Sequence, residues 1–363
     1  MRTVTVVLYG ASGYTGRLVA AELARRGVEH VLSGRDIAKL EPLGAEHGAP
    51  VRAVPLDDQA GLRDLLADAG AVINCAGPFT LAGDALVRAA VDSGTHYVDS
   101  AAEQSFVRMV FDRHGEAAER AGVALVPAAG FNSLPGDCIA RLAADGHEPL
   151  SELVTAYHID GFGMSRGALR SALDAMQSGG VIYDGGYWRP APSGVFRGSF
   201  DFPEPPGHQT MSRFPSGEVI TVPRHTQTLR VVSLLSARTA VPFSIGAELM
   251  PYLQPGLELA MRTPLRDLAQ EALRLLPEGP AEADRRASAW TVVADARAED
   301  GRASRVVARG VDVYGLTAVS LVHAATLVSA PDFDRAGALG PAAAFDPVAF
   351  LNFLGDHGVS WER

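Results

Sequence analysis

The residues best suited to chemistry are three glycines near the start of the chain. Gly10, Gly13 and Gly16 stand at equal spacing in VVLYGASGYTGRLVAAELARRG (6–27), between an apolar run and a helix-like run. After a strand, such glycines permit a tight turn, close backbone approach to a pyrophosphate and close packing of helix on strand. The helix start offers N–H groups and partial positive charge to phosphates. We therefore expect a dinucleotide site, the alternative being a glycine-rich turn without ligand. Side chains expected to add contacts are Ser12, Tyr14 and Thr15.

The end of the second strand-like run indicates which dinucleotide is bound. The run ends in VLSGR, with Ser33 and Arg35. A site specific for NAD usually has Asp or Glu about 20 residues after the loop, bonded to the ribose 2′-hydroxyl. Here a hydroxyl and a guanidinium stand instead, and Arg35 can bind a 2′-phosphate through two bonds and stack on adenine. NADP(H) is thus favoured over NAD, unless Arg35 is an ordinary surface arginine.

Two later strand ends extend this cofactor site, because ligands of open α/β sheets bind at the carboxyl ends of the strands. Asp57 follows the third strand, where we expect it to face adenine. NCAGPF follows the fourth, and Gly77 and Pro78 would let the backbone approach the nicotinamide. The alternative for NCAGPF is a tight turn only. The remaining members of the predicted cofactor set are Asn74, Ala76 and Phe79.

Candidate catalytic residues follow the fifth strand and lie in the second half of the chain. Tyr97 and Asp99 alternate with Val98 and so share one face of a strand, and Tyr157 offers a phenol. Reduction of an enoyl thioester needs a donor to the developing enolate oxygen and a proton source. The alternative is that the tyrosines pack in the core and Asp99 caps a helix. The predicted substrate-facing residues, from GFNSLPGD, are Phe131, Asn132 and Ser133, for which turn chemistry is the alternative.

Composition excludes several functions. The net charge of −10, with no long basic run, argues against nucleic acid or an anionic membrane surface as partner. Two cysteines, Cys75 and Cys138, form no disulfide framework or metal cluster, and no paired histidines suggest a metal site. We expect a cytoplasmic protein without signal peptide or stable membrane insertion, and the apolar stretch 313–330 as a buried helix.

The pattern of elements predicts an α/β protein. Short strands, apolar on both faces, alternate with helices over the first 145 residues, as in a Rossmann-type, doubly wound parallel sheet. Beyond them we expect an α+β domain with an antiparallel sheet, including a hairpin turning at EDGR (299–302) and helices over 244–276. The predicted domains are an NADP-binding domain over 1–145, a substrate or dimerisation domain over 146–312, and helices over 313–363 that return to the first domain.

Five segments in this order carry a family resemblance: GASGYTGRLVA, SGR, INCAGPF, SGTHYVDSAAE and GFNSLPGD. They resemble the saccharopine dehydrogenase-like reductases, closest to the branch with the trans-acting enoyl reductases of actinobacterial lipid and polyketide pathways. The resemblance covers residues 1–145. It implies an NADP-binding Rossmann domain, a second α+β domain that helps to form the substrate cleft, and often a dimer. It also implies that GPF lies beside the nicotinamide and GFNSLPGD near the substrate.

Three functions remain open from the sequence. The first is an NADPH-dependent reductase of a C=C bond in a hydrophobic lipid or secondary-metabolite intermediate, a small molecule or carrier-bound acyl chain, acting as a homodimer. The second is an oxidoreductase for a C–N bond of an amino compound, which cationic groups in the substrate cleft would favour. The third is a protein that senses NADPH without catalysis. The arginines to inspect for the second function are Arg166, Arg170, Arg189 and Arg224.

Overall fold

The computed structural model describes residues 5–178, 180–192, 198–240, 256, 263 and 271–363. The chain divides into two compact units, each described by itself. Unit 1 comprises Met1–Ala101, Ser105–Phe131 and Tyr314–Ala344, and unit 2 comprises Ala102–Gln104, Asn132–Val313 and Phe345–Arg363. Most of the helical region expected over 244–276 lies outside the described residues.

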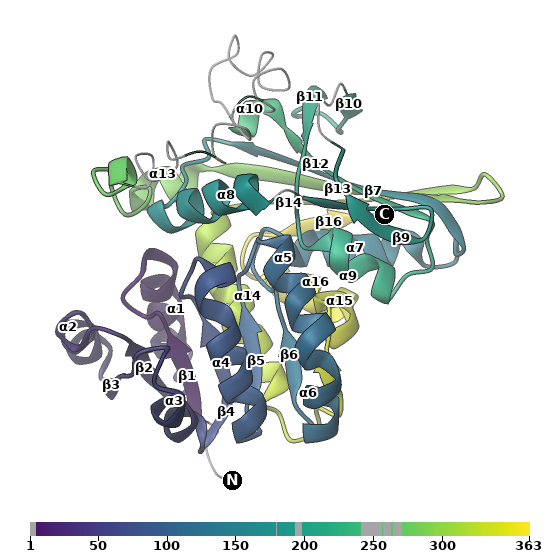
Figure 1. Cartoon of the computed structure of the whole chain (residues 1–363). Coiled ribbons are helices and arrows are strands. Elements are labelled where there is room, and N and C mark those ends of the chain that lie inside the picture. The colour runs from purple at the N-terminus through teal and green to yellow at the C-terminus, as the bar shows by residue number, and fades with distance from the viewer. Residues whose placement is uncertain (1–4, 179, 193–197, 241–255, 257–262, 264–270) are drawn as a thin grey trace. The chain divides into compact units, whose positions relative to one another are not determined.

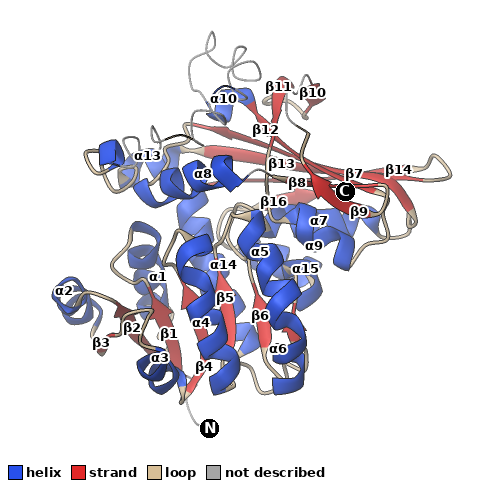
Figure 2. Cartoon of the chain, in the orientation of Figure 1, coloured by secondary structure: helices blue, strands red, loops and turns tan. Residues whose placement is uncertain are grey.

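Unit 1 is built on a seven-stranded sheet in the order β15-β6-β5-β4-β1-β2-β3, in which every neighbouring pair is parallel (Figures 1 and 2). No residue of β1, β4 or β5 is exposed, as expected for strands covered on both faces. The predicted Rossmann-type sheet is thus confirmed. The strands are β1 (Thr5–Tyr9), β2 (His30–Gly34), β3 (Val51–Ala53), β4 (Ala69–Asn74), β5 (His96–Asp99), β6 (Ala124–Val126) and β15 (Gly337–Ala338).

Helices alternate with these strands, as the sequence predicts, and one helical stretch is interrupted. The stretch between β5 and β6 contains a π-helical turn, η1 (Val110–His114). Three helices end at glycines with positive φ, Gly48, Gly94 and Gly122, a common C-terminal cap. The helices are α1 (Tyr14–Arg25), α2 (Ile37–His47), α3 (Gln59–Leu66), α4 (Phe79–Ser93), α5 (Gln104–Met109), α6 (Gly115–Ala121), α14 (Val313–Val328) and α15 (Pro341–Ala344).

The apolar stretch near the C-terminus forms α14, and its central residues are buried in unit 1. Leu321, Val322 and Ala325 have no exposed surface. Within the described ranges, the structure contains no helix of the length and apolarity needed to cross a bilayer.

Unit 2 is built on a nine-stranded mixed sheet. Its main order is β10-β11-β12-β7-β13-β14-β16, and the β8–β9 hairpin pairs with β12. All neighbours are antiparallel except β7 and β12, which are parallel. The expected hairpin at 299–302 joins β13 to β14 and is confirmed. The strands are β7 (Leu150–Asp160), β8 (Val181–Asp184), β9 (Tyr187–Pro190), β10 (Gly198–Asp201), β11 (His208–Arg213), β12 (Arg230–Ser236), β13 (Ala289–Ala298), β14 (Ala303–Val311) and β16 (Ser360–Glu362).

Helix α7 covers one face of this sheet, against β7, β13 and β14. The compact units therefore differ from the predicted boundaries. Residues 132–145 belong to unit 2 because α7 packs there, and residues 345–363 belong to unit 2 as well, whereas α14 belongs to unit 1. The helices of unit 2 are α7 (Leu134–Ala144), α8 (Arg166–Ser178), α9 (Glu218–Thr221), η2 (Val222–Arg224), α10 (Ala237–Ala240), α13 (Glu282–Ala287) and α16 (Pro347–Gly355).

Candidate functional site

The glycine loop between β1 and α1 has the geometry of a phosphate cradle. Gly10 has φ +82°, and a Cβ there would lie 2.7 Å from the backbone nitrogen of Ala76. A Cβ at Gly16 would lie 2.8 Å from the carbonyl oxygen of Ala11. Gly13 is different: it is exposed, and its Cβ would meet only the Gly10 carbonyl, at 3.3 Å. Gly10 and Gly16 thus allow backbone segments of the loop and its neighbours to approach closely. Gly13 leaves the solvent-facing side of the loop accessible to a ligand.

The N-terminus of α1 is available to bind phosphate. Its N-cap residue, Gly13, has no side chain to cap it, so N–H groups of its first turn remain for a ligand. The loop is fixed to the end of β2, because the backbone N–H groups of Gly10 and Ala11 both donate to the Ser33 carbonyl. Among the side chains predicted to add contacts, Ser12, Tyr14 and Thr15 are half-buried. The Tyr14 ring packs edge-to-face on Tyr314 of α14.

At the end of β2, the two predicted cofactor-binding side chains differ in their exposure to solvent. Ser33 is fully buried, and its hydroxyl donates to the carbonyl of Arg52 on β3 at 2.7 Å. Arg35 is exposed, and no ion-pair partner for it occurs in the part of the chain that the structure describes. Burial raises the pKa of the nearby Tyr9 phenol to about 12. The positive charge of Arg35 opposes this rise, and the negative charge of the exposed Asp57 adds to it. Arg35 is therefore the group free to bind a 2′-phosphate.

The turn after β4 is held by Asn74, whose side chain is almost fully buried. Its Nδ2 donates to the Tyr97 hydroxyl and its Oδ1 accepts from the backbone N–H of Ala76, both at 2.9 Å. Ala76 and Pro78 are half-buried, Gly77 is exposed, and α4 begins at the buried Phe79. The accessible part of this turn is therefore the backbone of residues 76–78, and Asn74 shapes it from beneath.

The predicted catalytic pair on β5 lies inside unit 1. Tyr97 and Asp99 have no exposed surface. Asp99 Oδ1 accepts the backbone N–H groups of Ala101 and Ala128, both at 2.8 Å, so it joins the ends of β5 and β6. Burial, with the Asp99 charge, raises the pKa of the Tyr97 phenol well above its usual value. The pair thus organises the strand ends, and its catalytic role stays a prediction.

The segment GFNSLPGD divides between the two units. Phe131 is buried in unit 1, where its N–H donates to the Thr317 hydroxyl of α14. Asn132, half-buried, begins the unit 2 segment. Ser133 is fully buried, and its hydroxyl accepts the N–H of Gly217 at 3.0 Å. A substrate contact by these residues stays a prediction, and Phe131 and Ser133 make the structural hydrogen bonds described above.

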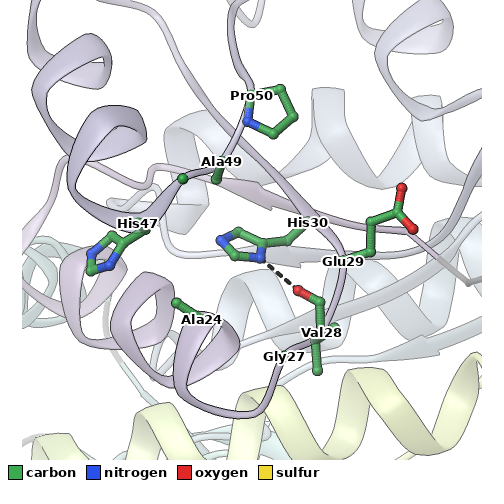
Figure 3. A pocket seen from close by; sticks show the side chains of 9 residues that line it. Ala24, Gly27, Val28, Glu29, His30, His47, Ala49 and Pro50 are labelled. Atoms are coloured by element: carbon green, nitrogen blue, oxygen red, sulfur yellow. Dashed lines mark hydrogen bonds between the residues drawn. The ribbon is translucent and has the colours of Figure 1, made fainter.

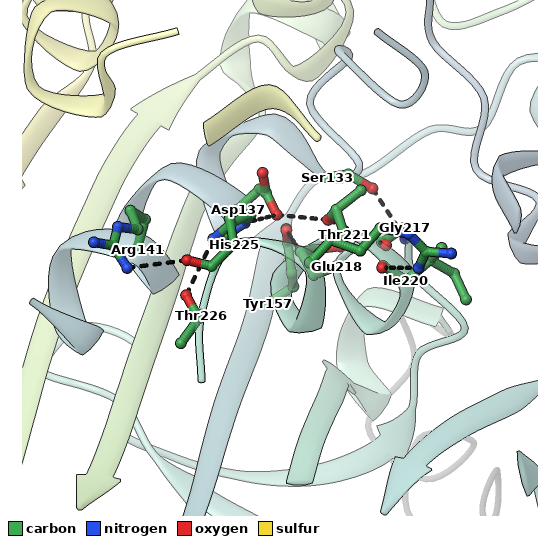
Figure 4. Close-up of polar contacts among 11 residues, drawn as sticks. Ser133, Asp137, Arg141, Tyr157, Gly217, Glu218, Ile220, Thr221, His225 and Thr226 are labelled. Atoms are coloured by element: carbon green, nitrogen blue, oxygen red, sulfur yellow. Dashed lines mark hydrogen bonds and ion pairs between the residues drawn. The ribbon is translucent and has the colours of Figure 1, made fainter. Parts of the chain in front are cut away.

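The other predicted catalytic residue, Tyr157 of β7, lies in a buried network in unit 2 (Figure 4). Its hydroxyl donates to Oε1 of Glu218, and a Cβ at Gly136 would collide with both groups. Burial is the largest cause raising the pKa of Glu218 to about 7, and the charge of Asp137 adds to it. The hydrogen bond from Tyr157 opposes that rise.

The same network holds the start of α7 against the 217–226 segment. Asp137 Oδ1 accepts from the Thr221 hydroxyl at 2.5 Å and lies 3.0 Å from His225 Nε2. Sequence reasoning did not select Glu218, which follows Gly217 at the start of a mostly apolar run. The glycine next to Asp137 was the available signal, since small residues mark close approach.

The structure thus gathers the predicted cofactor residues at the carboxyl ends of β1 to β4 in unit 1, and places Tyr157 and Ser133 in unit 2. The arginines singled out for a substrate acid group also lie in unit 2. Arg224 stacks over the Trp188 ring, whereas Arg189 is exposed. Among the described residues, no three or more His, Cys, Asp or Glu side chains form a group able to hold a metal.

Comparison with known proteins agrees with this geometry. Residues 6–126 match the family model of the saccharopine dehydrogenase NADP binding domain. These residues therefore form an NADP-binding domain of the saccharopine dehydrogenase type, and its cofactor is NADP(H). The match confirms the predicted cofactor and the family resemblance for this part of the chain, and it supports an NADP-dependent oxidoreductase.

Relatives named for two different activities match part of this chain. The trans-acting enoyl reductase of Mycobacterium ulcerans is 31% identical over 163 residues, 42% of this chain and 39% of the relative. The saccharopine dehydrogenase-like oxidoreductase of Bos taurus is 29% identical over 151 residues, 36% of this chain and 35% of the relative. Each match spans less than two fifths of the relative's length.

One solved structure is similar over the whole chain. It is the apo saccharopine dehydrogenase (L-Glu forming) of Saccharomyces cerevisiae, with a TM-score of 0.62, 14% identity and 99% coverage of both chains. At this identity the similarity establishes the fold, and it confirms the predicted two-domain class.

Proposed function

We propose that the protein is an NADPH-dependent reductase of an enoyl-type C=C bond in a hydrophobic lipid or secondary-metabolite intermediate. The observation that carries the cofactor half of this proposal is the open glycine loop together with the exposed Arg35 at the end of β2, which has no ion-pair partner among the described residues. The reaction half is supported by the relative named trans-acting enoyl reductase. The proposed substrate is a small molecule or an acyl chain on a carrier protein, and the proposed assembly is a homodimer.

In this proposal, the residues of the protein bind the cofactor and orient it. NADPH supplies a hydride when bound. The α1 N-terminus would hold the pyrophosphate, Arg35 the 2′-phosphate, and the 76–78 backbone would border the nicotinamide. The buried Asn74 keeps that turn in shape through its bond to Ala76.

The cofactor half is tested by titrating the full chain with NADPH and with NADH. We expect a preference for NADPH that falls at least tenfold in Arg35→Ala, because one charge-assisted contact is worth about 1.5–3 kcal/mol. Arg63→Ala, at an exposed arginine of α3, is the matched control and should bind as the native chain does. Equal binding of both dinucleotides would contradict the assignment.

The reaction half is tested by NADPH oxidation with a long-chain α,β-unsaturated thioester, compared with an oxo acid plus an amine. Oxidation with the thioester alone supports the proposal. Oxidation only with the oxo acid and amine would instead support the second candidate, a C–N oxidoreductase. That candidate is favoured by Arg166 and Arg170 of α8, which are half-buried and have no ion pair within the described ranges.

A further inference from the structure

The two edges of the unit 1 sheet differ in how side chains join the strand ends. At the amino edge, a surface hollow of about 420 Å³ is lined by residues 24, 27–30 and 47–50 (Figure 3). The hydrogen bond drawn there joins His30 only to its own loop, at the Val28 carbonyl. At the carboxyl edge, by contrast, side chains of β4 and β5 connect the ends of β4, β5 and β6. This is the edge at which open parallel sheets bind their ligands, so these connections bear on the cofactor.

Asn74 of β4 and Tyr97 of β5 make the first of these connections. Asn74 and Val72 share one face of β4, and the register places Tyr97 opposite Val72, so the two polar side chains are diagonal neighbours. The Tyr97 hydroxyl accepts from Nδ2 of Asn74 at 2.9 Å. Both side chains are at most 1% exposed, so water cannot readily replace this bond.

Asp99 fixes the strand ends beside the Tyr97 phenol. Its Oδ1 accepts the backbone N–H groups of Ala101 and Ala128, and its carbonyl accepts that of Ala129, all at 2.8 Å. Ala128 is buried with φ +59°, a conformation that a non-glycine residue keeps where its surroundings impose it. Burial, and then the nearby Asp99 charge, raise the pKa of the Tyr97 phenol, which therefore stays protonated. The ends of β5 and β6 thus form a fixed base for the phenol.

Asn74 carries this connection to the turn after β4. Its Oδ1 accepts the N–H of Ala76 at 2.9 Å, while its Nδ2 is engaged by Tyr97. An amide that donates through its nitrogen on one side presents its oxygen on the other, so the phenol orients the acceptor that holds Ala76. Ala76 also lies against the glycine loop, because a Cβ at Gly10 would be 2.7 Å from its nitrogen. Loss of the phenol hydroxyl should therefore loosen the backbone of residues 76–78.

We propose that Tyr97 is a positioning residue that acts through Asn74 on the backbone of residues 76–78 and so fixes the nicotinamide half of the bound cofactor. This inference rests on the part of the proposed function that places the nicotinamide beside that turn, and it does not depend on the C=C reaction. The α1 N-terminus and Arg35 hold the other half of the cofactor in that proposal. Binding of the adenine half should therefore not respond to Tyr97.

The test compares two ligands of the full chain by calorimetric titration. One is NADPH, and the other is 2′,5′-ADP, which has the adenine and the 2′-phosphate but no nicotinamide. Tyr97→Phe keeps the ring and removes only the hydroxyl. We expect its NADPH affinity to fall about fivefold, as the loss of one hydrogen bond allows, while its affinity for 2′,5′-ADP stays within about twofold. The gain in nicotinamide fluorescence when NADPH binds should also become smaller.

A second variant interrupts the same connection from its other side. Asn74→Ala should show the same selective loss, and it keeps the test decisive if Tyr97→Phe folds poorly. The double variant should bind NADPH no more weakly than the weaker single variant, because both substitutions remove one connection. Tyr187→Phe, at a tyrosine of β9 that is 68% exposed, is the matched control and should bind both ligands as the native chain does.

The ratio of the two affinities decides the outcome. An unchanged ratio in the variants would overturn the proposal. An equal fall for both ligands would also overturn it, because a merely structural Tyr97 would weaken both halves of the site together. Failure of the native chain to bind either ligand would instead count against the cofactor half of the proposed function, and this inference would fall with it.

Discussion

Replacing Glu218 with glutamine should change how the stability of unit 2 depends on pH. Its carboxyl is fully buried and close to Asp137, and these two causes raise its pKa from 4.5 to about 7 although the hydrogen bond from the Tyr157 phenol opposes the rise. Folding therefore retains a proton on Glu218 that the unfolded chain has released between these two pH values. Where the folded state binds more protons, stability falls as pH rises.

The size of this effect follows from the shift. A rise of about 2.5 pKa units corresponds to about 3 kcal/mol at 1.36 kcal/mol per unit. The contribution of Glu218 to the free energy of unfolding should thus fall by about 3 kcal/mol as pH rises from about 4.5 through about 7, and stay level above that. In Glu218→Gln the amide oxygen still accepts from Tyr157 but does not ionise. That variant should lack this fall and be the more stable protein at about pH 8.

Tryptophan fluorescence can follow unit 2 alone, because Trp188, Trp290 and Trp361 all lie in it. Urea unfolding at a series of pH values, in the native chain and the variant, yields the difference in free energy of unfolding. Other titrating groups are shared by both chains and cancel in that difference. The exposed Glu299→Gln is the matched control and should follow the native curve. Parallel curves for native chain and Glu218→Gln would refute the reasoning, because Glu218 would then ionise as it does in solvent.

Three further substitutions test the packing on which the site depends. Gly16→Ala places a methyl 2.8 Å from the Ala11 carbonyl, so NADPH affinity should fall at least tenfold in a fluorescence titration; native affinity would contradict the packing role. Asn74→Ala removes the acceptor for the Ala76 N–H and should lower the stability of unit 1, measured by hydrogen exchange, by about 1–3 kcal/mol. An unchanged stability would show that the turn does not depend on this hydrogen bond. Gly136→Ala forces a methyl into the phenol–carboxyl pair of unit 2 and should lower its thermal midpoint while NADPH binding stays; an unchanged midpoint would show that the pair can move aside.

The fold of unit 1 was predictable because each of its strands and helices has a recognisable pattern in its own short stretch of sequence. Each strand is a short apolar run beside a helix with its own polar face, so the alternation shows in the sequence. The hairpin at 299–302 was predictable for the same reason. The parallel pairing of β7 with β12 was not, because it joins residues far apart in the chain, and turn residues do not specify such pairing.

At the candidate site, the sequence did not predict the direction in which each side chain points. Ser33 and Arg35 stand two residues apart, and both belong to the predicted cofactor set. The register of β2 with β3 places Ser33 opposite Arg52, so its hydroxyl bonds that carbonyl, while Arg35 extends beyond the sheet into solvent. A partner strand therefore decides which of two suitable residues is available, and the local sequence does not contain that strand.

The predicted catalytic residues illustrate the same ambiguity in chemical terms. Tyrosines and carboxylates are the groups that proton transfer needs, and they are also the groups that satisfy one another inside a protein. Asp99 accepts two backbone N–H groups, and the phenol of Tyr157 donates to Glu218. A phenol that delivers a proton to a substrate must first give up such a bond. For Tyr157 that bond is to a carboxyl whose pKa lies near 7. A catalytic Tyr157 would therefore tie the rate of reduction to the ionisation of Glu218, whereas a structural Tyr157 ties only the stability of unit 2 to it.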